Sequence, residues 1–71
     1  MKVNLILAAT RLRIMLEEAA CDFRKMSGGD FDVEAFREWV ILENPELGGI
    51  VKNLSLFDLI TILQKIGVID E

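Results

Sequence analysis

Side chains that could perform catalysis are few in this chain, and none has a suitable partner near it in the sequence. Histidine and tyrosine are absent, and neither Ser27 nor Ser55 has a general base beside it. Glu17 and Glu18 are neighbours in a segment that we expect to be helical, where successive side chains point about 100° apart and do not share a substrate. We expect Cys21 to be a small packing residue, because a single lysine one turn away is a weak means of activating its thiol. The sequence therefore predicts no catalytic site, no cofactor and a protein that is not an enzyme.

Three acidic residues, Asp30, Asp32 and Glu34, alternate after a double glycine and invite comparison with a calcium loop. An EF-hand loop places oxygen ligands at positions 1, 3, 5 and 12 and a glycine at position 6. If Gly29 takes position 6, the ligand positions hold residues without a carboxylate: Arg24, Met26, Gly28 and Ala35. The stretch resembles an EF-hand frame without its ligands. A chain with one cysteine and no histidine also lacks the ligands of a zinc site, so we expect no metal.

Charge is spread unevenly along the 71 residues, whose net charge is −4. Residues 1–26 carry five basic and three acidic side chains, a net +2, whereas residues 27–71 carry three basic and nine acidic ones, a net −6. The acidic balance disfavours binding to nucleic acid or to anionic lipid.

A nucleic-acid-binding regulator of the helix-turn-helix kind is the alternative function. Residues 45–53 and 55–66 could form its two helices. It would use the basic side chains of the N-terminal segment: Lys2, Arg11, Arg13, Arg24 and Lys25. These side chains spread around the helical wheel, so the sequence makes nucleic acid the weaker alternative.

Apolar residues recur at three- and four-residue steps, which is typical of amphipathic helices. The pattern predicts an all-α fold in one domain, residues 1–71, with one long N-terminal helix and two or three shorter helices in a small bundle. We expect these helices to span residues 3–26, 33–43, 45–53 and 55–66. The segment Ser27–Gly29 ends the first helix, Asp30 or Asp32 caps the second, and Ser55 caps the last.

The long first helix has a main apolar stripe from Leu5 to Met26, which we expect to face the core. The predicted core combines this stripe with the apolar faces of the later helices: Leu12, Leu16, Phe23, Phe36, Val40, Leu56, Leu59, Ile60 and Leu63.

A second apolar line lies opposite that stripe, at near-heptad spacing. Hydrophobic residues make up 52% of the chain, more than so small a domain needs for its own core. We therefore expect a homodimer, in which a second copy covers this line: Val3, Leu7, Ile14 and Cys21. An exposed line that contacts nothing is the other interpretation.

A partner of another kind is also consistent with the sequence, because small acidic helical proteins can occupy a basic cleft on a larger protein. The candidate surface consists of four glutamates: Glu34, Glu38, Glu43 and Glu46. A solvated helix face is the alternative interpretation. No stretch approaches the ~20 apolar residues of a membrane span. The sequence thus predicts a cytoplasmic protein that binds other proteins as an adaptor, assembly factor or regulator.

Overall fold

The structure is a computed structural model that describes the backbone of residues 2–70 and the side chains of residues 3–70. Five helices and no strand occupy this part of the chain, so the all-α prediction is confirmed. The helices are α1 (Lys2–Ala8), α2 (Thr10–Ser27), α3 (Val33–Glu43), α4 (Pro45–Val51) and α5 (Leu56–Lys65). None of them is long and apolar enough to cross a membrane.

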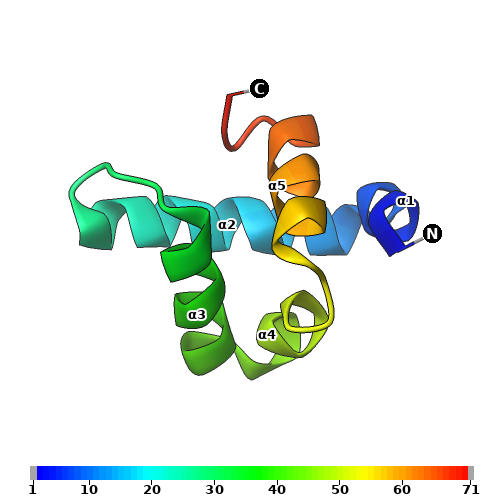
Figure 1. Ribbon diagram of the computed structural model, residues 1–71, viewed down its shortest axis with the longest axis horizontal. Helices are drawn as coiled ribbons and strands as arrows, with labels where there is room; N and C mark the ends of the chain where they lie inside the picture. The colour runs from blue at the N-terminus through cyan, green and yellow to red at the C-terminus, as the bar shows by residue number, and fades with distance from the viewer. Residues whose placement is uncertain (1, 71) are drawn as a thin grey trace.

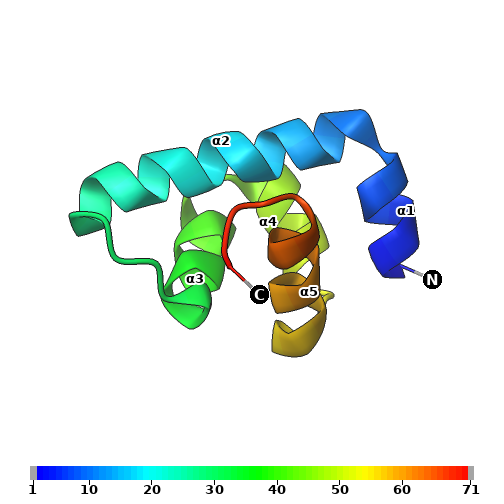
Figure 2. The same ribbon diagram turned by 90° about the horizontal axis from the view of Figure 1, so that it is seen from above.

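The arrangement is built on α2, the longest helix, which runs along one side of the molecule (Figures 1 and 2). Figure 2 shows that the other four helices all lie on one side of α2, which leaves its other side facing outward. Helices α3 and α4 pack on each other, and α5 packs on α1 and α3.

The predicted N-terminal helix is not continuous, because it divides at Ala9. This residue is extended, with φ −87° and ψ 98°, and α1 turns away from the axis of α2 (Figure 2). The N–H of Ala9 still donates to Leu5 and its carbonyl accepts from Arg13, both at 3.1 Å, so the turn sacrifices few hydrogen bonds. In exchange α1 packs on α5 and buries Ile6 to 6% exposure. The burial of Ile6 is a tertiary gain that offsets the cost of interrupting a helix.

The other helix ends follow local rules closely. Gly28 takes the left-handed conformation after α2, with φ 76°. Helix α3 has the expected bounds, with Asp32 as its cap. Asn44 caps α4 by accepting from the Leu47 N–H at 3.1 Å, and α4 ends at Val51, two residues before the predicted end. Helix α5 starts at Leu56 after its Ser55 cap.

The core lies between α2 and the other helices and contains six of the nine predicted core residues. Four aromatic rings cluster there: the Phe23 ring centroid is 5.6 Å from those of Phe31, Phe36 and Trp39. The core residues that the sequence did not identify are mostly small or lie in the later segments: Ile6, Ala19, Ala20, Leu47, Val51, Leu54, Ile62 and Val68.

Three predicted core residues are not fully buried. Leu12 is half-buried and packs against the core from the first turn of α2. Leu56 and Ile60 are only partly buried, because α5 turns Leu59, Ile62 and Leu63 inward instead. An α-helix that is apolar over most of its circumference can present any of several faces, and the packing of α1 and α3 selects this one.

Candidate interaction surfaces

Two of the polar side chains considered for chemistry, those of Asp32 and Ser55, serve as helix caps. The Asp32 carboxylate accepts a hydrogen bond from the Glu34 N–H at 3.0 Å, at the start of α3. The Ser55 hydroxyl oxygen accepts one from the Asp58 N–H at 3.0 Å, at the start of α5. Such bonds satisfy N–H groups that have no partner within a helix. In the described part of the chain, no three His, Cys, Asp or Glu side chains are grouped so as to hold a metal ion.

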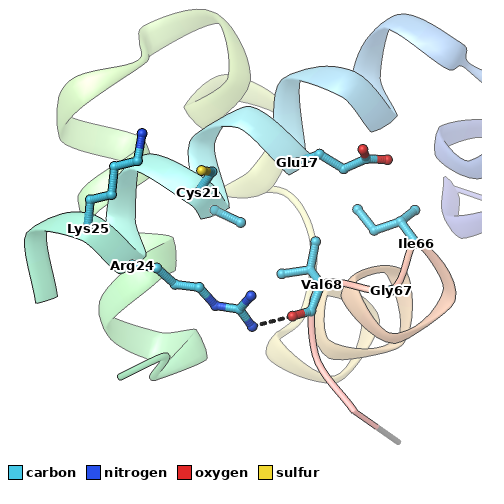
Figure 3. Close-up of a pocket in the computed structure, with 8 residues that line it drawn as sticks. Glu17, Cys21, Arg24, Lys25, Ile66, Gly67 and Val68 are labelled. Carbon is cyan, nitrogen blue, oxygen red and sulfur yellow. Dashed lines mark hydrogen bonds between the residues drawn. The ribbon is translucent and has the colours of Figure 1, made fainter. Parts of the chain in front are cut away.

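Cys21 is exposed on α2, so the expectation that it packs inside the chain is wrong. Figure 3 shows its surroundings: a groove between α2 and the turn that follows α5. Arg24 closes one side of this groove, where its guanidinium donates a hydrogen bond to the Val68 carbonyl and lies over the Phe31 ring. Glu17 and Lys25 line the groove as well.

The four residues of the predicted dimer contact do not lie on one line. Val3 and Leu7 belong to α1, where both are half-buried and pack against the core. Ile14 and Cys21 belong to α2, where Ile14 is 49% exposed. The turn at Ala9 separates the two pairs. Only Ile14 and Cys21 are therefore displayed on the surface that the sequence suggested.

The side of α2 that faces away from the other helices is here called the outer face of α2. All its side chains are exposed: Ile14, Glu17, Glu18, Cys21, Arg24 and Lys25, with the exposed Arg11 and Asp22 at one margin.

The four glutamates of the predicted acidic surface lie in three places. Glu34 and Glu38 line one groove, beside the segment that leads into α5. Glu43 lines another groove, formed with α2. Glu46 is engaged in an ion pair, its Oε1 lying 3.0 Å from the Arg11 Nη2. They do not form the single acidic patch that a basic cleft would recognise.

The basic side chains proposed for nucleic acid are also dispersed. Arg11 is paired with Glu46, and Arg24 is bonded to the Val68 carbonyl. Arg13 and Lys25 are exposed at different places along α2. The side chain of Lys2 lies outside the described residues. Phosphate binding draws on several cations that act together, and the described ones are not gathered for it.

Large apolar side chains are exposed on four of the helices. The exposed fractions are 69% for Leu5, 49% for Ile14, 62% for Met26, 80% for Leu42 and 74% for Phe57. Reasoning from the sequence placed Leu5 and Met26 on the inward stripe. For Leu5 the cause is the turn between α1 and α2, whereas Met26 lies in the last turn of α2. Phe57 adjoins the partly buried Leu56 and Ile60, which extends the apolar surface along α5. The apolar residues that cover most of α5, where only Asp58 and Lys65 are charged, were the sequence signal for this surface.

The exposed apolar side chains, together with the outer face of α2, are the candidate functional surfaces of the molecule. No protein-family model, curated protein or solved structure matches this chain, so these surfaces are the evidence for its function.

Proposed function

We propose that this protein works by binding other proteins, as an adaptor, assembly factor or regulator, and that it also associates with itself. The observation that carries this proposal is the exposure of large apolar side chains on a chain of only 71 residues. Leu42 and Phe57 are 80% and 74% exposed, whereas Val40 and Leu59 on the same two helices are completely buried. Burial of each such side chain against a partner is worth about 1.5–3 kcal/mol.

The small size of the chain supports the same proposal. A chain of this size buries a modest fraction of its surface, so its stability margin is small without a disulfide, a metal or a partner. The chain has one cysteine, which excludes a disulfide within it. A partner that binds only the folded state would add stability by mass action.

Sedimentation analysis of the full chain tests the proposal directly. The weight-average mass should rise above the 8.0 kDa of the single chain as its concentration goes from low micromolar to several hundred micromolar. Binding of an apolar fluorescent dye should fall when Leu42 and Phe57 are both replaced by serine, because these side chains supply exposed apolar area. A single-chain mass at every concentration, with no dye bound, would contradict the proposal.

A further inference from the structure

No other helix covers the outer face of α2; the C-terminal turn borders one edge of it, where Arg24 donates a hydrogen bond to the Val68 carbonyl. Figure 2 shows that every other helix lies on the opposite side of α2, and that α1 turns away from this face. The helix has 18 residues, which corresponds to roughly 27 Å at 1.5 Å per residue. Another helix could therefore lie along it, with the C-terminal turn beside one of its edges.

Charges on this face are arranged in two flanking rows with the same internal spacing. Glu17 and Arg24 are seven residues apart and line the groove beside the C-terminal turn. Glu18 and Lys25 are also seven residues apart, and Glu18 lines the groove on the α3 side. Residues seven apart lie almost directly above one another, because seven residues make nearly two helical turns. Between residues 17 and 25, each row thus runs from an acid to a base; Arg11, seven residues before Glu18, extends one row and is paired with Glu46.

These charges are largely unused within the chain. Both ion pairs of the described residues lie elsewhere, between Arg11 and Glu46 and between Arg37 and Glu38. Of the four charges in the rows, Arg24 has a hydrogen bond, to the Val68 carbonyl, and its guanidinium has further N–H donors.

We propose that the outer face of α2 binds the same face of a second copy in antiparallel orientation, with the two Cys21 residues at the two-fold axis. This inference rests on the self-association proposed above. A two-fold axis through Cys21 places Glu18 opposite Lys25 of the second copy, and Glu17 opposite Arg24. Symmetry repeats both pairs. A parallel pairing would instead place like charges against each other, which is unfavourable.

Apolar contacts fit the same register. Ile14 lies as far before Cys21 as Gly28 lies after it, so Ile14 of each chain meets Gly28 of the other. Ile14 is half-exposed, and no atom lies within 4 Å of the place where a Cβ on Gly28 would stand. A register centred nearer the N-terminus would use Arg11, which is already paired with Glu46.

The small side chain of Cys21 allows close approach at the axis. Packed helices lie about 8–10 Å apart, and each Cα lies about 2.3 Å from its own axis. Facing Cα atoms are then separated by about 3.4–5.4 Å, and the upper part of this range overlaps the separation of about 4.4–6.8 Å that a disulfide requires. A disulfide between the two Cys21 residues is therefore a specific signature of this contact.

The experiment uses oxidation of the reduced full-length chain by a diazene such as diamide. The two thiols lose two protons and two electrons as the S–S bond forms, and the diazene N=N takes them up to become a hydrazine. The wild-type chain should form a covalent dimer rapidly at low salt and more slowly at high salt. Lys25→Glu alone and Glu18→Lys alone should each slow this reaction roughly tenfold, because two symmetry-related attractions become repulsions.

Two rescues test the pairing itself. The double variant Glu18→Lys/Lys25→Glu should crosslink at the wild-type rate. An equimolar mixture of the two single variants should do so as well, because each chain then offers the charges that the other lacks. Lys52→Glu is the matched control for Lys25→Glu, because it makes the same change in net charge at an exposed site outside α2. Its crosslinking rate should match that of the wild type at low salt. Circular dichroism should show equal helicity for all variants.

The outcomes separate this inference from the proposed function. If sedimentation shows a dimer but neither rescue restores crosslinking, the chain associates through another face and the α2 pairing is wrong. If Lys25→Glu crosslinks as fast as the wild type, the disulfide comes from random collision and the pairing is likewise overturned. Cys21→Ser should still dimerise in sedimentation, since the thiols are not needed for the contact. A chain that is monomeric at every concentration overturns both proposals.

Discussion

Gly48 shows how much depends on one residue in a small core. A Cβ placed on it would lie 2.7 Å from the Ile41 Cα and 3.1 Å from the Val40 carbonyl oxygen. Both atoms belong to the backbone of α3 and cannot swing aside as the end of a side chain can. The glycine therefore sets how closely α4 approaches α3.

Gly48→Ala should destabilise the protein by about 1–3 kcal/mol, because the extra methyl group forces the two backbones apart. Gly49→Ala is the matched control, since nothing lies within 4 Å of its Cβ position. It should be neutral or stabilise the chain by up to about 1 kcal/mol, because alanine is the better helix former. Chemical denaturation measures both free energies of unfolding. Equal effects of the two substitutions would mean that α4 does not pack on α3 as described.

At the scale of the elements, most of the fold follows from local sequence signals. Helix α3 has the predicted bounds, and Gly28 and Ser55 act at helix ends as expected. The inward stripe of α2 could also be identified, because Leu16 and Phe23 lie on the opposite side of the helix from most of its charged residues. These features depend on periodicity and capping, which the sequence records directly.

The turn at Ala9 and the rotation of α5 could not be predicted, because both depend on contacts between distant segments. No glycine or proline marks Ala9, and only the packing of α1 on α5 rewards the turn. Likewise α5 offers two overlapping apolar faces, and its neighbours favour Ile62 over Ile60. The predicted contact line was drawn on one continuous helix, so the same turn divided it.

Two adjacent residues of α1 test the turn at Ala9. Ile6→Ala should cost about 2–5 kcal/mol, because Ile6 is 6% exposed and its loss leaves a cavity between α1 and the core. Leu5→Ala should change the free energy of unfolding by no more than about 0.5 kcal/mol, since Leu5 is 69% exposed. Denaturant titration distinguishes the two. In a straight helix Leu5 would lie on the inward stripe and Ile6 would not, so a larger effect of Leu5→Ala than of Ile6→Ala would argue against the turn.

For the whole molecule, the apolar surface that the fold leaves exposed stabilises the chain only when association buries it. The described chain has no buried polar or charged residue, so its core is held by apolar contacts alone. Exposed apolar side chains on four helices add nothing to that core until something covers them. If self-association covers part of this surface, folding and association become linked equilibria, and the stability of the chain depends on its concentration.

The thermal unfolding midpoint should therefore rise with protein concentration. For a dimer of folded chains above its dissociation constant, each tenfold increase in concentration adds about 0.7 kcal/mol of stability per chain. In a domain of this size, that increment raises the midpoint by roughly 3–5 °C. Calorimetry or circular dichroism at several concentrations measures the shift. Lys25→Glu should move the onset of this rise to roughly tenfold higher concentration, while leaving the midpoint at low concentration unchanged, because Lys25 is exposed on the outer face of α2 and contributes nothing to the core. A wild-type midpoint that stays constant over a hundredfold range would show that the folded chain is a monomer, and the exposed apolar side chains would then be available only to a different protein.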